Sequence, residues 1–123
     1  MKKDLKDLTE PLPPVPPLTP AVFYVMLSLA DGEKHGYAIM QETTALSDGK
    51  FRMGPGTLYT TLQRLLDTGL IEEVAGKRNT EDSRRRYYRL TGRAKSLLES
   101  ELARMDSAVR MARRRKLAPG TAE

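Results

Sequence analysis

Between residues 53 and 70, apolar and polar positions repeat with the period of a helix. Leu58, Leu62 and Leu65 recur at intervals of four and three residues, so they share one face that must be buried. The opposite face carries small and hydrogen-bonding residues, namely Gly56, Thr57, Thr60, Gln63, Arg64 and Asp67. A proline just before this segment suits the first helical turn, and a glycine just after it suits the exit. The pattern predicts a helix with one buried and one solvent-facing side.

Two further helices are predicted upstream. The Thr-Pro pair at 19–20 is typical of a helix start, and residues 21–30 are apolar on most sides, which predicts a helix buried on most sides. A second helix is predicted over residues 37–47. His35 lies in the turn that leads into it, and we interpret this histidine as a turn residue rather than a pH sensor.

The hydrophobic period changes after the third helix. Residues 70–74 and 86–90 are short β-prone runs, and the loop 75–85 that joins them is polar. This arrangement predicts a β-hairpin with a basic tip. Tyr87 and Tyr88 are consecutive on the second strand, so one of the two is expected to face the core.

Beyond residue 91 the chain turns helical again, and an apolar seam runs along it through Leu98, Leu102, Met105, Val109 and Ala112. Three helices and a hairpin already enclose a small core, so we expect this seam to pack against a second copy of the chain. The alternative is that the seam folds back on the first helix. The expected organisation is a flexible Pro-rich arm (1–17), a DNA-binding domain (18–91), a dimerisation helix (92–113) and a basic disordered tail (114–123).

The positive charge of the chain is concentrated in one stretch. The chain has 21 basic and 16 acidic residues, a net charge of +5, whereas residues 76–95 alone hold eight Lys or Arg and two Asp or Glu. A charge run by itself is equally consistent with a solvated face. Next to a polar helix face, it favours a surface that binds phosphate groups.

The residue inventory argues against an enzyme, a metal centre and a membrane protein. The chain has no cysteine and one histidine, so disulfides and thiolate metal sites are excluded, and no acid–base pair has motif spacing. No apolar run approaches the ~18 residues of a membrane span, and the N-terminal region lacks the apolar segment of a signal peptide. We therefore expect a cytoplasmic protein without a cofactor.

Three helices followed by a hairpin is the order of a winged helix-turn-helix, a mainly α fold with a small β-hairpin. In this fold, the second helix of the helix-turn-helix pair enters the major groove of double-stranded DNA. The residues predicted to contact base edges are Thr57, Thr60 and Gln63. Gly54 and Gly56 let backbone N–H groups approach a phosphate. The side chains predicted to contact phosphates are Arg64, Arg78, Arg84, Arg85 and Arg86. Tyr59 either packs under the helix or reaches a phosphate with its hydroxyl group.

Four segments resemble the PadR family of bacterial transcriptional regulators: residues 18–39 with a His-Gly-Tyr motif, residues 55–72 with Gly-Thr-Leu-Tyr, the wing 84–91, and the helix directly after it. The resemblance implies a winged-helix homodimer held by the C-terminal helix and helix 1. It also implies a repressor released from its operator by a small molecule or a stress signal. By position, it supports Thr57, Tyr59 and the arginines at 84–86 as DNA-facing.

The chain departs from the family pattern at two points. Ala94 stands where the motif after the wing usually has glycine, so the junction between the wing and the last helix is expected to differ slightly. The chain also has no tryptophan, so the aromatic sandwich that some short relatives use for planar drugs is not implied.

We therefore predict a homodimeric, sequence-specific DNA-binding regulator that acts on a palindrome-like operator. Its half-sites would lie about 34–36 Å apart, or a multiple of that distance. A small-molecule effector is the second expected partner. The alternative is a winged-helix module that binds only proteins, and such a module would tolerate loss of charge from the exposed helix face and the wing.

Overall fold

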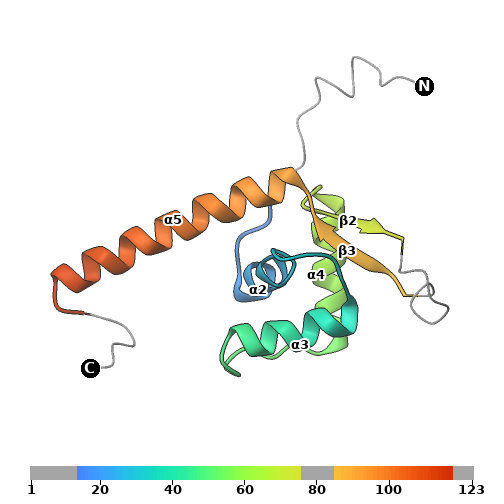
Figure 1. The fold of residues 1–123 in the computed structure, drawn as a ribbon, viewed down its shortest axis with the longest axis horizontal. Coiled ribbons are helices and arrows are strands. Elements are labelled where there is room, and N and C mark those ends of the chain that lie inside the picture. Colours follow the sequence, from blue (N-terminus) through green and yellow to red (C-terminus); the bar gives the residue numbers. More distant parts are fainter. Residues whose placement is uncertain (1–13, 76–84, 118–123) are drawn as a thin grey trace, which may run out of the picture.

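The computed structural model describes residues 14–75 and 85–117 (Figure 1). In these ranges, helices and strands surround one buried helix, and one long helix extends away from them. In chain order the elements are α2 (Pro20–Ser28), β1 (Lys34–His35), α3 (Gly36–Leu46), α4 (Pro55–Asp67), β2 (Ile71–Val74), β3 (Tyr87–Leu90) and α5 (Gly92–Arg114). The predicted fold class, mainly helical with a small sheet, is confirmed. Most of the predicted arm and tail, and the wing residues Arg78 and Arg84, lie outside the described residues.

The helix α2 occupies the centre of the core. It contacts α3, α4 and α5, and every residue from Ala21 to Leu29 is buried or half-buried, as its apolar sequence predicts. Its one buried polar side chain, Ser28, donates a hydrogen bond to the carbonyl oxygen of Val25 at 2.7 Å. Leu58, Leu62 and Leu65 of α4 pack into the same core, while Ile39 contributes from α3. The neighbouring elements are therefore oriented by the need to cover α2.

Local hydrogen bonds set where the helices begin. The hydroxyl of Thr19 accepts from the backbone N–H of Val22 at 3.3 Å and caps α2, as predicted. The helix α4 has Gly54 as N-cap and Pro55 in its first turn, where the missing N–H costs no hydrogen bond. It ends at Asp67, and the chain turns away at Gly69, whose φ of +74° is a conformation that glycine adopts without strain.

The sheet has three strands rather than the two of the predicted hairpin. The strand order is β1-β3-β2, and β1 pairs antiparallel with β3 through Lys34 opposite Tyr88 and His35 opposite Tyr87. The sequence could not indicate β1 because two residues are too short to display an alternating pattern. The prediction that one of Tyr87 and Tyr88 faces the core is confirmed by Tyr88. Both are buried, Tyr88 in the core and Tyr87 with its ring 5.4 Å from that of His35.

The last helix, α5, packs against the domain with its first turns and extends away from it over the rest of its length (Figure 1). Ala94 and Leu98 are buried in the shared core, and α5 contacts α2 and β3. Beyond this point Leu102 and Met105 are 39% and 37% exposed. The expectation that the whole seam is left for a partner therefore needs correction. Leu98 is covered by its own chain because α5 starts directly beside α2, whereas the rest of the seam is not.

One hydroxyl group joins α5 to the end of α4. Thr91 accepts a hydrogen bond from the backbone N–H of Ala94 at 3.3 Å, capping α5, and donates one to the carbonyl oxygen of Gly69 at 2.7 Å. At Ala94, α5 starts as a regular capped helix and the methyl group lies in the core, while the difference from the family pattern at this junction stays a prediction.

Replacing Thr91 should destabilise the fold measurably. Thr91→Ala removes a helix cap and a second hydrogen bond, and we expect it to lower the free energy of unfolding by about 2 kcal/mol. Urea denaturation at equal protein concentration measures the difference. Thr91→Ser keeps the hydroxyl and should lose less than about 1 kcal/mol. Equal losses in both variants would show that packing of the methyl group, not hydrogen bonding, holds this junction.

Candidate nucleic-acid interface

The solvent-facing side of α4 matches the side predicted from sequence. Its buried positions are Leu58, Thr61, Leu62 and Leu65. The predicted contact residues on this helix and at its N-terminus are all exposed: Gly54, Gly56, Thr57, Tyr59, Thr60, Gln63 and Arg64. The helix therefore presents a continuous polar strip that no other described element covers.

One side chain of this strip is already oriented by a neighbour. The Gln63 Nε2 atom donates a hydrogen bond to Asp67 Oδ1 at 2.9 Å, one helical turn further along. The bond is exposed, so it contributes little to stability. It holds the Gln63 amide in one orientation and leaves the amide oxygen for another partner.

The wing places arginines next to carboxylates. Arg86, just before β3, has its Nε 3.6 Å from Glu73 Oε2 of β2, and Arg89 Nε of β3 lies 2.7 Å from Glu72 Oε2 of β2. These exposed cross-strand pairs are worth little in water. They reduce the net charge of the wing, so the basic surplus seen in the sequence is smaller at this part of the surface. Arg85 has a different neighbour, since its Nη1 atom lies 2.8 Å from His35 Nε2.

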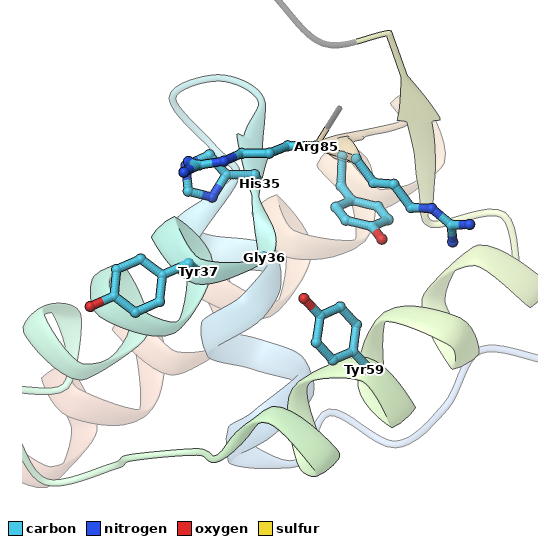
Figure 2. A pocket seen from close by; sticks show the side chains of 7 residues that line it. His35, Gly36, Tyr37, Tyr59 and Arg85 are labelled. Atoms are coloured by element: carbon cyan, nitrogen blue, oxygen red, sulfur yellow. The ribbon is translucent and has the colours of Figure 1, made fainter. Parts of the chain in front are cut away.

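A pocket of about 310 Å³ lies where α3, α4 and β3 meet (Figure 2). Its lining residues are His35, Gly36, Tyr37, Tyr59, Arg85, Arg86 and Tyr88. Figure 2 shows the Tyr59 hydroxyl pointing from α4 towards Gly36. A Cβ atom on Gly36 would lie 2.8 Å from that oxygen, so the glycine makes room for the tyrosine. Tyr59 is 53% exposed, which places its ring beside the core rather than in it.

Sequence reasoning assigned no binding role to His35, Gly36 or Tyr37. The residues come from the turn before α3, and the pairing of β1 with β3 brings them beside Arg85, fifty residues along the chain. The signal that could have marked them is the His-Gly-Tyr motif itself.

The buried tyrosine of this pocket stays neutral over a wide pH range. Burial of the Tyr88 ring raises the pKa of its hydroxyl above the ordinary value of 10.0, and the negative charge of Glu73 raises it further. Arg86 acts in the opposite direction. At neutral pH a tyrosine hydroxyl is protonated even at its ordinary pKa, so Tyr88 can donate a hydrogen bond there.

Neither a metal-binding cluster nor a membrane-spanning helix is found in residues 14–75 and 85–117. No three carboxylate or imidazole side chains there gather in a group that would hold a metal ion. None of the helices in these ranges is long and apolar enough to cross a bilayer.

Comparison with known proteins identifies the family. Residues 25–100 match the model of the transcriptional regulator PadR-like family. The chain belongs to this PadR-like family. A Mycobacterium tuberculosis relative named transcriptional regulator Rv3488 is 34% identical over 87 residues, which cover 71% of this chain and 77% of the relative.

Solved PadR structures share the fold. A PadR family transcription regulator from Clostridium difficile R20291 matches with a TM-score of 0.66 and 22% identity, covering 78% of this chain and 97% of that one. Bacillus subtilis PadR, solved in complex with operator DNA, matches with a TM-score of 0.59 and 23% identity over 70% of this chain and 48% of that one. The resemblance found in the sequence is confirmed, and this PadR-like chain is a transcriptional regulator rather than an enzyme.

Removing the charge of Glu73 should lower the pKa of Tyr88. A carboxylate disfavours a second negative charge nearby, so Glu73→Gln makes ionisation of Tyr88 easier. Ultraviolet titration of tyrosinate, with Tyr88→Phe to assign the signal, measures the shift. Glu72→Gln is the matched control, because that carboxylate pairs with Arg89 on the neighbouring register pair. An unchanged or higher Tyr88 pKa in Glu73→Gln would contradict the stated cause.

Proposed function

We propose that this PadR-like regulator binds operator DNA sequence-specifically, with α4 in the major groove and the wing along the backbone. The main support for this proposal is the polar strip of α4, which is exposed while the opposite side of the same helix is buried. A helix with this division of surfaces, next to arginines of a wing, fits the groove geometry of winged helix-turn-helix proteins. The operator complex of Bacillus subtilis PadR, which has the same fold, supports the proposal.

Different residues are proposed to recognise the DNA sequence and to bind the DNA backbone. Side chains that reach base edges carry sequence information, whereas contacts to phosphates supply affinity. We assign base contacts to Thr57, Thr60 and Gln63, which stand along the exposed strip. Phosphate contacts are assigned to the α4 N-terminus at Gly54 and Gly56, to Arg64, and to the wing residues Arg78, Arg84, Arg85 and Arg86.

We further propose that two copies of the chain associate through the outer part of α5. Leu102, Met105, Val109 and Ala112 repeat at intervals of three and four residues, and on a helix these positions form a single stripe. Leu102 and Met105 are exposed in the isolated chain, and an exposed apolar stripe is costly unless a partner covers it. A twofold dimer would present two α4 helices to a palindrome-like site.

The family resemblance also supports repression relieved by a small-molecule effector. A pocket of about 280 Å³ lies between the start of α5 and α2, lined by Leu27, Ala30, Leu98 and Leu102 among others. The pocket adjoins the proposed dimer stripe, so an occupant would contact both the core and the interface.

Binding to the DNA upstream of its own gene, against random duplex at two salt concentrations, tests the function. We expect a strong preference for the upstream DNA and a steep fall of affinity with salt. Thr60→Ala should lose ~1–3 kcal/mol of discrimination at one base position, whereas Arg64→Ala should weaken all DNA alike and reduce the salt slope by about 1. Weak, equal binding to both duplexes, unchanged in both variants, would favour the protein-interaction module instead.

A charge placed in the α5 stripe should break the dimer. Met105→Lys is expected to shift sedimentation from dimer to monomer, because a buried lysine in an apolar interface loses its hydration. Ser107→Lys is the matched control, since it adds the same charge to an exposed position on the opposite side of the helix. If both variants sediment like the original protein, the interface lies elsewhere.

A further inference from the structure

A hollow of about 550 Å³ lies between the start of α2 and the side of α4 that faces it, and we call it the α2–α4 hollow. Thr19 and Ala21 line it from the start of α2, an end of the helix to which no binding role has been assigned. Four of its eight lining residues are threonines and one is Arg64, and none of these described residues is a carboxylate.

Thr61 is the buried polar side chain of the α2–α4 hollow. It lines the hollow from α4 and is only 6% exposed. The buried hydroxyls of Ser28, Thr43 and Thr68 each donate to a backbone carbonyl oxygen, whereas the Thr61 hydroxyl has no hydrogen-bond partner within residues 14–75 and 85–117. In these ranges no polar side-chain atom is shut off from both a partner and the solvent. The Thr61 hydroxyl therefore opens into the hollow.

Two helix starts supply backbone donors to the α2–α4 hollow. The first N–H groups of a helix have no partner inside that helix. In α2 the N–H of Val22 donates to the hydroxyl of Thr19, but the N–H of Ala21 donates to no described residue. In α4 the N-cap Gly54 has no side-chain hydrogen bond, which leaves the N–H of Gly56 available. Helix starts attract negative charge, so the hollow is suited to an anion.

The position of the α2–α4 hollow indicates which anion it takes. Tyr59 lies on the flank of α4 next to the wing, where it borders the pocket of Figure 2. Thr57 and Thr61 lie on the other flank, next to α2. Thr60 and Gln63 stand between the two flanks, on the strip proposed to contact bases. A helix in the major groove has a sugar–phosphate backbone along each flank, so the group that meets the α2 flank is a phosphate.

We propose that the α2–α4 hollow binds one phosphodiester group of the operator backbone, with the Thr61 hydroxyl and the Ala21 N–H donating to its oxygens. Arg64, which lines the same hollow, supplies positive charge. The proposal rests on the DNA-binding function above, and it adds Thr61 and the start of α2 as contacts. The phosphate supplies the acceptor that the Thr61 hydroxyl does not find among the described residues.

The first test removes this hydroxyl alone. Thr61→Val keeps the branched shape of the side chain, and it should melt at the same or a higher temperature because no hydrogen bond within the described fold is lost. We expect ~10-fold lower affinity for operator and random duplex alike, since a phosphate contact carries no sequence information. The salt slope should stay unchanged in Thr61→Val because no charge is removed, whereas Arg64→Ala should reduce it by about 1.

Thr43→Val is the matched control. Thr43 is also a buried threonine on a helix, but its hydroxyl donates to the carbonyl oxygen of Met40 at 2.9 Å, and it lies outside the hollow. We expect this variant to lose stability and to keep its affinity for DNA. Thr61→Ser retains the hydroxyl and should lose less affinity than Thr61→Val. Wild-type affinity in a folded Thr61→Val, or equal losses in Thr61→Ser and Thr61→Val, would overturn the proposal.

The second test needs no variant. In ¹H–¹⁵N NMR spectra of the full-length protein, the amide proton of Ala21 should move downfield when duplex is added, because it gains a charge-assisted hydrogen bond. The amide of Gly92, at the start of α5 and outside the hollow, is the internal control and should not move. An unmoved Ala21 amide in the DNA complex would overturn the proposal. A shift with inorganic phosphate and none with duplex would also overturn it, and would assign the hollow to a free phosphate.

The outcomes distinguish this contact from the function on which it rests. DNA binding by the wild-type protein, together with wild-type affinity in Thr61→Val and an unmoved Ala21 amide, overturns the phosphate contact alone. Absence of DNA binding by the wild-type protein overturns both. Loss of affinity in Thr61→Val at unchanged melting temperature, together with the Ala21 shift, supports both.

Discussion

Burial of α2 on nearly all sides is the constraint on which the rest of the structure depends. An apolar helix in the middle of a small domain requires each neighbour to contribute a covering face, and α3, α4 and α5 all contact it. Covering α2 uses the leucine side of α4, so the polar side of that helix must point outwards. The surface proposed to read DNA is therefore a direct consequence of how the core is filled.

Sequence reasoning succeeded where a periodic pattern extended over several turns. The helices α2, α3, α4 and α5 were predicted because their apolar positions repeat, and the exposed face of α4 followed from the same repeat. The strand β1 was missed because two residues carry no period, so the packing of Tyr87 beside His35 of that strand was not predicted. The pocket at His35 depends on the same pairing across fifty residues, so in the sequence only the His-Gly-Tyr motif at one side of it could be noticed.

The proposed contacts of single residues with bases and phosphates are harder to predict from sequence than the fold. Periodicity says which side chains are exposed, and the structure agrees for the residues of α4. Exposure does not say what they contact.

The proposed DNA-binding and dimerisation helices meet at one hydrogen-bonded junction. Thr91 donates to the carbonyl oxygen of Gly69, its own N–H bonds to Leu70, and Arg93 donates to Thr68 at the end of α4. The start of α5 is thereby tied to the end of α4 by three bonds within a few residues. In the proposed dimer, a change in how two α5 helices pack would be passed through these bonds to the separation of the two α4 helices. Since operator half-sites have a set spacing, affinity for DNA would then depend on the geometry of the α5 pair.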